Sequence, residues 1–503
     1  MKRGKGNLGA QDQLVSKKNA HDHGDGFEQP RKIVVKETDD ASDMGNISKH
    51  EEPLSPMACL NADALFDSYI LIIVGFKNEI DVKSLKILLQ NNLAKHQRFS
   101  SVAVKDTHNN LKWCPTEVVI EDHVIVPCLS LSTVEDPNFI NEYTSSLVTA
   151  PSFNPSRPLW EVHVLNVCSG DTKASLVFRI HHSLGDCTSM ISLAINSTSQ
   201  AADANVSPTI RQHKSSDQKS TGFLQFFYNM VLGLWLTFLS MLQYGATLVW
   251  KQDRNLLTEE NRAKISKKRL AHVTLSIEDI CLVKNAVNGT LNDVIMGALS
   301  AGLLRYMSRR QSEQRLQLNT RFRTIVAVNL RPFTVLKDLD KNMENPSKVM
   351  WGNKVGFWIF PFPAIHYEDP LQYCRDITMI SRRKKLSSEA YLSNALDKLM
   401  PTKLVAYLVS ILFARTTLVL SNVLGPVEEI QLGDNPITHI IPTTQINYVS
   451  IMIHFMSYAG KGKLVALVSE DVIPNPQQLC EDCADALQVM KEAEAKTTPL
   501  NLS

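Results

Sequence analysis

The pattern of apolar and polar positions divides the chain into a polar beginning, two mixed halves and an apolar segment between the halves. Residues 1–51 are polar, rich in charge and poor in aromatic side chains, which is typical of a disordered tail. After Asp67 the run SYILIIVGF predicts a buried strand, and apolar residues then recur at helical spacing from Val82 to Leu93. The first half, residues 52–213, therefore opens with a strand and a helix.

A predicted hairpin further along this half ends in two adjacent histidines. Residues 160–167 and 173–180 have the pattern of strands, and the sequence Cys-Ser-Gly-Asp between them predicts a turn. His181 and His182 follow the second strand directly, and a helix is expected to begin at Cys187. The histidines are thus predicted on a strand-to-helix turn, a place where a rigid scaffold presents side chains to a cleft.

The second half, residues 271–497, repeats this mixture of strands and helices. Gly460 and Gly462 are spaced like a fragment of a phosphate loop, but a hairpin turn explains them without a nucleotide. With similar content in both halves, the fold class is predicted to be α+β. The expected elements of the second half are a strand at 271–276, a helix at 291–307, a strand at 324–328, a strand leading into Ser421 and Asn422, and a hairpin of 448–456 and 463–469.

The pair of histidines is the strongest indication of chemistry. Asp186 follows four residues after His182, and a neutral imidazole on such a turn can take a proton from an alcohol near neutral pH. The chain has 14 histidines, so an accidental pair on a surface or in a core is the alternative. The strand, the spacing to Asp186 and the predicted helix together favour a catalytic role.

Composition narrows the class of protein. At 503 residues the chain is too long for one compact core, and two lobes are expected. The 53 Lys and Arg against 51 Asp and Glu give a net charge of +2, which provides no field for a nucleic-acid partner. Nine scattered cysteines and a first segment, MKRGKGNLGA, without an apolar core indicate reduced thiols in a protein that faces the cytosol.

One pair of cysteines has the spacing of a metal or redox motif. Cys480 and Cys483 lie in a predicted helix that begins after Asn475 and Pro476, and no second Cys or His pair stands near them in the sequence. Ordinary helix cysteines are the favoured interpretation, and no metal site is predicted.

The histidine motif is similar to the HHxxxDG signature of thioester-using acyltransferases, which are built like chloramphenicol acetyltransferase and the condensation domains of peptide synthetases. Within that superfamily the chain resembles the plant bifunctional wax ester synthase/diacylglycerol acyltransferases, from Glu52 to about Ala495. Six short strings in series carry the resemblance, namely EPLSPM at 52–57, PLWE at 158–161, LNDV at 291–294, VNLR at 328–331, GNK at 352–354 and SNVLGP at 421–426.

The resemblance implies a two-lobed, chloramphenicol-acetyltransferase-like pseudo-dimer with a tunnel between the lobes. Residues 52–213 would form the N-terminal acyltransferase lobe and residues 271–497 the C-terminal one. Residues 214–270 would form a crossover of apolar sequence followed by a basic linker. The implied reaction moves a long-chain acyl group from acyl-CoA, as co-substrate and without a further cofactor, to a fatty alcohol or to diacylglycerol.

The apolar crossover carries no charge from Ser220 to Trp250 and is long enough to span a bilayer. A single crossing would separate the two lobes, so we expect an interfacial or re-entrant element, with bends at Gly233 and Gly245, that docks the enzyme on a membrane surface. An ordinary buried helix pair is the alternative. This expectation, with the lipid substrates, implies the cytosolic side of the endoplasmic reticulum membrane, or the plasma membrane. A basic cluster just beyond could meet lipid headgroups or CoA phosphates, or be a solvated helix face (Arg262, Lys264, Lys267, Lys268 and Arg269).

By the family pattern His182 is the general base that removes the hydroxyl proton, and no acyl-enzyme is required. Asp186 either orients His182 or, as the superfamily pattern favours, forms a structural ion pair with an arginine, for which Arg331 is the suggested partner. His181 is expected to shape the turn or the tunnel wall, and Gly185 to support the turn.

Further residues are expected to line or support the tunnel. Pro158, Leu159 and Trp160 would fix the lobe and line the acyl channel, with a core tryptophan as the alternative. Asn292 and Asp293 would be polar tunnel groups, although Thr290 to Asp293 also fits a capping box that opens a helix. Asn422 belongs to the same group of tunnel residues by the resemblance.

The chain departs from the family pattern at one position, where Cys187 replaces the glycine after the aspartate. Glycine there would permit a positive φ or a close approach, so cysteine is expected to twist the turn or narrow the tunnel and to reduce activity. Two other functions stay open: an HHxxxD acyltransferase with another acceptor, and a non-catalytic relative that binds acyl-CoA or lipid.

Overall fold

The computed structural model describes residues 52–63, 66–108, 110–129, 136, 138–203, 205–210, 222–250, 253, 255, 257, 267–311, 322–331 and 351–497. The predicted disordered tail at 1–51 lies outside the described residues, and so do Arg262 and Lys264 of the basic cluster.

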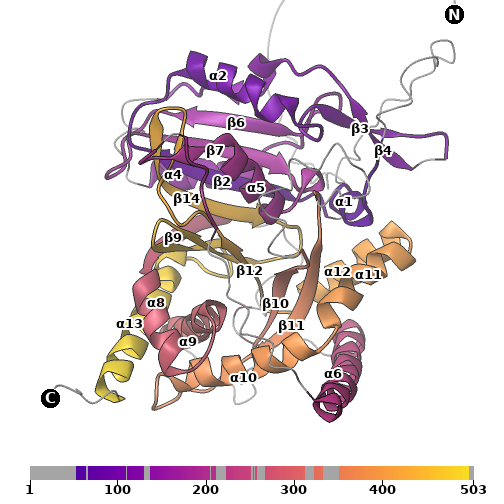
Figure 1. Ribbon diagram of the computed structural model, residues 1–503, viewed down its shortest axis with the longest axis vertical. Coiled ribbons are helices and arrows are strands. Elements are labelled where there is room, and N and C mark those ends of the chain that lie inside the picture. Colours follow the sequence, from indigo (N-terminus) through magenta and orange to yellow (C-terminus); the bar gives the residue numbers. More distant parts are fainter. Residues whose placement is uncertain are drawn as a thin grey trace, which may run out of the picture. The chain divides into compact units, whose positions relative to one another are not determined.

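A seven-stranded sheet forms the first lobe (Figure 1). The predicted hairpin is confirmed, because β6 and β7 are antiparallel neighbours with Trp160 opposite Ile180. The predicted buried strand is β2, which pairs with the histidine strand β7 along its whole length. In order across the sheet the strands are β5 (Val124–Ile125), β6 (Trp160–Leu165), β7 (Ala174–His181), β2 (Tyr69–Phe76), β14 (Asn435–Gln445), β13 (Ile430–Leu432) and β8 (Ser199–Gln200).

Two strands of this sheet come from the second half of the chain. β14 pairs antiparallel with β2, so that Tyr69 faces Gln445 and Phe76 faces Ile437. Residues 430–445, which the sequence places in the second lobe, therefore complete the sheet of the first. Pairing between segments so far apart in the chain leaves no trace in local periodicity, which is why the pattern could not predict it.

A six-stranded sheet forms the second lobe. The predicted final hairpin is confirmed, but its turn is shorter than expected: Ala459 (φ 45°) and Gly460 (φ 74°) join β15 to β16, as a two-residue turn with two positive φ angles does. In order the strands are β11 (Val355–Phe362), β10 (Phe322–Asn329), β12 (Leu418–Leu424), β15 (Ile451–Tyr458), β16 (Lys461–Ser469) and β9 (Lys268–Ser276).

Helices and a small sheet surround the first lobe. The helical periodicity after Val82 corresponds to α2, which is capped by the side chain of Asp81. The small sheet joins β1 (Glu52–Pro53), β4 (Leu111–Pro115) and β3 (Ser101–Lys105). The helices and 3-10 turns are α1 (Pro56–Asn61), α2 (Val82–Asn91), η1 (Leu93–Lys95), η2 (Ile120–Asp122), α4 (Phe139–Val148), η3 (His182–Leu184) and α5 (Cys187–Ser197).

In the second lobe α8, α9 and α13 lie beside one another and share a core with the six-stranded sheet (Figure 1). Cys483 of α13 is buried there; a Cβ on Gly302 of α9 would lie 2.5 Å from its Sγ. The two helix cysteines are thus core residues, and in the described part of the chain no group of three His, Cys, Asp or Glu side chains could hold a metal. The helices are α8 (Ile277–Ala286), α9 (Leu291–Gln311), α10 (Gln372–Leu386), α11 (Glu389–Leu399), α12 (Thr402–Ala414) and α13 (Pro476–Thr497).

The apolar crossover forms one continuous helix, α6 (Phe223–Val249), which packs against α10, α11 and α12. By length and composition this helix could cross a membrane, and only 6% of its most apolar 18-residue stretch is buried inside the protein. Its buried side chains are those of Thr237, Ser240, Tyr244 and Thr247, so a polar stripe faces the protein.

The outer face of α6 is apolar and exposed, as at Leu224 and Trp235. The alternative of a buried helix pair is therefore wrong, and the helix continues through both glycines instead of bending back. A Cβ on Gly233 would lie 2.8 Å from the carbonyl oxygen of Leu386, so this glycine permits close packing on α10.

Candidate active site

His182 opens the 3-10 turn at the end of β7 and contacts the second lobe directly. Its Nδ1 lies 3.0 Å from Oδ1 of Asn353, while Nδ2 of Asn353 donates to the backbone carbonyl of His182 at 2.9 Å. The second bond fixes which end of the amide faces the ring. Oδ1 can only accept, so Nδ1 carries the proton and Nε2 keeps its lone pair.

A second amide approaches the same ring nitrogen from α1. Nδ2 of Asn61 lies 3.4 Å from Nδ1 of His182, and Oδ1 of Asn61 accepts from the hydroxyl of Ser68 at 2.8 Å. The contact with Asn353 is shorter and determines the tautomer. Burial lowers the pKa of His182 below its usual 6.5, which keeps the imidazole neutral and able to accept a proton.

His182 lines a cavity of about 90 Å³ between the two lobes, which we call the catalytic cavity. The first lobe contributes Asn61, His182 and Cys187 to it, among others, and the second contributes Asn353 and Asn422. Much of the remaining wall is apolar, with Met57, Leu60 and Phe66 from the first lobe and Val355, Phe357, Val409, Phe413 and Met452 from the second. His182 thus lies where residues of the two lobes meet.

A larger cavity of about 550 Å³, the lysine cavity, adjoins the catalytic cavity and contains Lys284 and Lys385 in its wall. The two cavities share Thr188 from α5 and four residues of the second lobe (Ala327, Asn329, Asn422 and Val423). A substrate that reaches His182 therefore has a second space next to it, with positive charge in its wall.

Asp186 fixes the catalytic turn to the second lobe through a buried ion pair. Its Oδ2 lies 2.7 Å from Nη1 of Arg331 and accepts from the backbone N–H of Lys354 at 3.0 Å. Its Oδ1 caps α5 by accepting from the N–H of Ser189 at 2.9 Å. The suggested pairing with Arg331 is confirmed, and no hydrogen bond to His182 is among these contacts.

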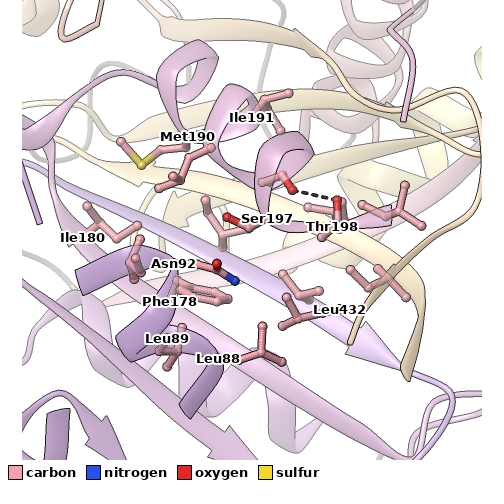
Figure 2. A pocket seen from close by; sticks show the side chains of 18 of the residues that line it. Leu88, Leu89, Asn92, Phe178, Ile180, Met190, Ile191, Ser197, Thr198 and Leu432 are labelled. Atoms are coloured by element: carbon pink, nitrogen blue, oxygen red, sulfur yellow. Dashed lines mark hydrogen bonds between the residues drawn. The ribbon is translucent and has the colours of Figure 1, made fainter. Parts of the chain in front are cut away.

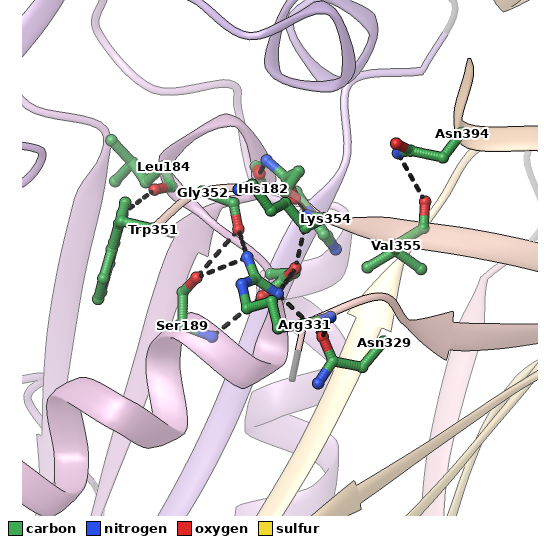
Figure 3. A network of polar contacts seen from close by, with 12 residues as sticks. His182, Leu184, Ser189, Asn329, Arg331, Trp351, Gly352, Lys354, Val355 and Asn394 are labelled. Atoms are coloured by element: carbon green, nitrogen blue, oxygen red, sulfur yellow. Dashed lines mark hydrogen bonds and ion pairs between the residues drawn. The ribbon is translucent and has the colours of Figure 1, made fainter. Parts of the chain in front are cut away.

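Arg331 ties the same turn to the segment that carries Asn353. Its Nη2 donates to the backbone carbonyl of Gly352 and lies 3.3 Å from the hydroxyl of Ser189. Nearby, the indole N–H of Trp351 donates to the carbonyl of Leu184 at 2.9 Å (Figure 3). The network therefore holds residues 351–353 against the histidine turn. This positions the Asn353 side chain beside Nδ1 of His182.

His181 points away from the catalytic cavity, because successive strand residues face opposite sides. Its Nδ1 lies 2.7 Å from the hydroxyl of Ser183, its Nε2 is 3.4 Å from Oδ1 of Asp67, and its ring meets Tyr69 edge-on. His181 thus shapes the turn, as one of the two expectations for it states, and it does not line the catalytic cavity.

Gly185 and Cys187 flank Asp186 and differ in what they require of the backbone. Gly185 is extended (φ 164°), and a Cβ there would lie 2.9 Å from the Cε of Met190, so close packing explains this glycine. Cys187 is the first residue of α5 and has no positive φ, so the expected twist of the turn is wrong. Its side chain lines the catalytic cavity, and burial raises the pKa of its thiol to about 12.

Pro158, Leu159 and Trp160 lie in the core of the first lobe. The ring of Trp160 stacks on His123, with centroids 4.2 Å apart, and its N–H donates to the carbonyl of Phe99 at 2.9 Å. The described walls of the catalytic and lysine cavities include none of the three. The structure therefore agrees with the alternative of a core tryptophan and places Leu159 in the same core.

Asn292 and Asp293 have different roles. Asp293 accepts from the N–H of Thr290 at 2.8 Å while its own N–H lies 3.3 Å from the Thr290 hydroxyl, which is the reciprocal capping box. Asn292 lines the lysine cavity, and its Oδ1 accepts from Nδ2 of Asn422 at 3.1 Å. Asn422 lines both cavities, so the two amides form a polar pair where the cavities meet.

Comparison with known proteins gives the same picture over most of the chain. The wax ester synthase/diacylglycerol acyltransferase catalytic domain matches residues 138–295, and the C-terminal domain of that family matches residues 351–491. Wax ester synthase/diacylglycerol acyltransferase 5 of Arabidopsis thaliana is 35% identical over 479 residues, covering 88% of this chain and 94% of the relative. The chain belongs to the wax ester synthase/diacylglycerol acyltransferase family. Wax ester synthase/diacylglycerol acyltransferase 4 of the same plant is 33% identical, covering 91% of this chain and 93% of the relative.

Solved structures share the fold of this family member. The wax ester synthase/diacylglycerol acyltransferase of Marinobacter aquaeolei VT8 superposes with a TM-score of 0.58 at 16% identity, covering 88% of this chain and 99% of that one. The trichothecene 15-O-acetyltransferase of Fusarium sporotrichioides gives 0.54 at 12% identity, covering 88% and 95%. The two-lobed α+β fold expected from the sequence is thereby confirmed.

The sequence did not single out three residues that the structure places around His182 in this family member. Asn353 belongs to the family string GNK but is not marked there as a functional residue, and no motif or pattern in the sequence marks Asn61 or Thr188. Neighbouring family strings were the available clue, because VNLR contains Arg331 and GNK contains Asn353, and both strings meet at the histidine turn.

Proposed function

We propose that this protein transfers a fatty acyl group from acyl-CoA to the hydroxyl of a fatty alcohol or diacylglycerol, with His182 as the general base. The observation that carries the proposal is the neutral imidazole between the lobes, whose Nδ1 is bonded to Asn353. The lone pair on Nε2 is then available to a hydroxyl, and family membership supplies the class of substrates.

In the proposed reaction the hydroxyl oxygen attacks the thioester carbonyl while Nε2 of His182 takes the hydroxyl proton. The ester C–O bond forms, the C–S bond breaks, and the imidazolium returns the proton to the departing CoA sulfur. Acyl-CoA is a co-substrate, and the scheme draws on no metal or prosthetic group. Activity should therefore persist in the presence of EDTA.

Apolar side chains from both lobes support this chemistry at the catalytic cavity. Phe66 comes from the first lobe, while Val409 and Phe413 come from α12 of the second. A wall of this kind aligns alkyl chains and keeps water from competing with the alcohol for the thioester. Burial also raises the pKa of the Cys187 thiol to about 12, which leaves His182 and not this cysteine as the group for proton transfer.

The protein is further proposed to work at a membrane surface, on which α6 lies with its exposed face in the lipid. Leu224 is 83% exposed and Leu234 66%, whereas the buried positions of the helix are polar. A large contiguous apolar surface of this kind marks an interaction site, and an interfacial helix buries such a face in the headgroup region. Exposed Arg382 and Arg383 on the neighbouring α10 suit anionic headgroups.

The cytosolic side of the endoplasmic reticulum membrane, or the plasma membrane, is the proposed location, since both lipid acceptors reside in membranes. Flotation of the purified protein with anionic liposomes tests the surface. The double variant Leu234→Glu and Trp235→Glu should stay at the bottom of the gradient. Flotation of that variant as strong as that of wild type would refute docking through α6.

The reaction is tested with radiolabelled palmitoyl-CoA and either dodecanol or diacylglycerol. Wild type should form wax ester or triacylglycerol, and His182→Ala should lose activity by about 10²–10⁴-fold, the usual contribution of a general base. A wild-type protein that binds acyl-CoA and forms no ester with any acceptor would leave the binding relative as the correct interpretation.

A further inference from the structure

A third cavity lies within the first lobe, between α2, α5 and the sheet, and we call it the α2–α5 cavity. Its volume is about 130 Å³, and its wall is apolar except for Asn92, Ser197 and Thr198. Figure 2 shows Leu88 and Leu89 of α2 facing Met190 and Ile191 of α5 across it. A dry space of this composition fits an alkyl chain and offers little to a polar ligand.

The cavity runs away from the catalytic turn along α5. At one end are Ile180, two residues before His182, and Met190, whose N–H bonds to the carbonyl of Asp186. At the other end are the polar residues, where α2 and α5 both finish. From Met190 to Ser197 the helix advances about 10 Å at a rise of ~1.5 Å per residue.

Helix α5 borders this space and the other two cavities. Thr188 lines both the catalytic and the lysine cavity, and Ile191 lines both the lysine and the α2–α5 cavity. Residues three apart share a face of a helix, so one face of the first turns of α5 borders all three spaces in series.

We propose that the α2–α5 cavity holds the distal methylenes of the acyl chain of acyl-CoA and thereby sets the chain length of the donor. This inference rests on the proposed acyl transfer. A donor whose carbonyl lies beside His182 can pass its chain by Thr188 and Ile191 into this apolar space.

The surroundings of the lysine cavity favour the donor over the acceptor as the source of the chain. Lys284 and Lys385 bring positive charge to that cavity, which suits the phosphates of CoA. The catalytic cavity is bordered on another side by Val409 and Phe413 of α12, which packs against the exposed helix α6. An acceptor that arrives from a membrane at α6 would reach His182 from there.

The test is Ala194→Phe, which fills the α2–α5 cavity from α5 without touching the catalytic cavity. Each methylene kept out of an apolar site costs roughly fourfold in binding, so exclusion of two or three should lower kcat/KM for palmitoyl-CoA by more than about tenfold. Hexanoyl-CoA should react as it does with wild type, which also shows that the variant is folded.

Asn196→Phe places the same ring on the exposed side of α5 and is the matched control, with a donor profile expected to equal that of wild type. Should Ala194→Phe be insoluble, Ala194→Leu should give a smaller shift in the same direction. With palmitoyl-CoA fixed, the preference of Ala194→Phe for decanol over octadecanol should match that of wild type.

An active Ala194→Phe variant with an unchanged donor profile would overturn the inference. A changed alcohol profile with an unchanged donor profile would assign the cavity to the acceptor and also overturn it. A wild-type protein without ester product from any donor would instead refute the proposed function, so the two failures are distinguishable.

Discussion

The bond between Asn353 and His182 allows the proposed base to be tested without removing the imidazole. In Asn353→Leu the Nδ1–H of His182 loses its 3.0 Å acceptor inside a buried site. A buried donor left without a partner costs about 1–3 kcal/mol. If that cost falls on the reacting orientation and tautomer, kcat should decrease by about 5–150-fold.

Asn353→Asp should give a different result, because a carboxylate in place of the amide favours the charged imidazole. An opposite charge at hydrogen-bond distance raises a histidine pKa by roughly 1–3 units. Only neutral His182 can act as a base, so activity rises as the pH increases through its pKa. The acidic limb of the rate profile should therefore move to higher pH by that amount, and activity lost at pH 7 should return in alkaline buffer.

The assay measures initial rates of palmitoyl transfer to dodecanol at saturating acyl-CoA from about pH 5 to 9.5. Asn394→Leu is a matched control, since Asn394 donates to the carbonyl of Val355 at 3.1 Å and this bond does not involve His182 (Figure 3). A wild-type kcat in Asn353→Leu, or a loss in Asn353→Asp that higher pH does not reverse, would show that Asn353 does not position the base.

Three further predictions concern the surroundings of the site. Arg331→Met leaves the buried Asp186 carboxylate without its cationic partner and should lower the free energy of unfolding by about 3–5 kcal/mol in denaturant titrations. Adding Asp186→Asn should recover part of this loss. An Arg331→Met variant as stable as wild type would contradict the structural role of the ion pair. Cys187→Gly should stay within about tenfold of wild-type activity, since the helical backbone there is unstrained and only a small side chain leaves the cavity wall; a gain of several orders of magnitude would show that cysteine distorts the turn. Burial lowers the pKa of His96 and of His454 to about 3. Between pH 6.5 and 3 the unfolded chain therefore binds protons at these positions that the folded protein does not, and the free energy of unfolding should decrease below pH 6.5, by about 2 kcal/mol per histidine at pH 5. His96→Phe should flatten the profile of unfolding midpoint against pH.

Local periodicity predicted those parts of the fold whose cause is local. The strand β2, the hairpin of β6 and β7 and the start of α5 follow from apolar spacing and turn residues within short windows. The pairing of β14 with β2 does not, because the partner strands are distant in sequence and both are simply apolar. The same holds for the exposed side of α6, since an apolar helix in a core and one on a surface have similar composition.

Within the site, the sequence predicted residues whose chemistry is visible by type. His182 stands out by its motif, and the ion pair of Asp186 with Arg331 could be suggested because the superfamily that the chain resembles pairs this aspartate with an arginine. Asn353 could not be singled out, since an asparagine carries no charge and its role depends on which end of the amide faces the ring. The sequence could not decide between a core and a channel for Trp160, because a large aromatic residue near a motif suits either.

The insertion of β14 beside β2 has a consequence for the synthesis and folding of the protein on the ribosome. Until residues 435–445 emerge, the strand next to the histidine strand presents an unpaired apolar edge. At the usual elongation rate of about 5–20 residues per second, that edge stays open for tens of seconds. Efficient biosynthesis should therefore depend on chaperones that shield nascent strands, and separate expression of the first half should yield an aggregating fragment.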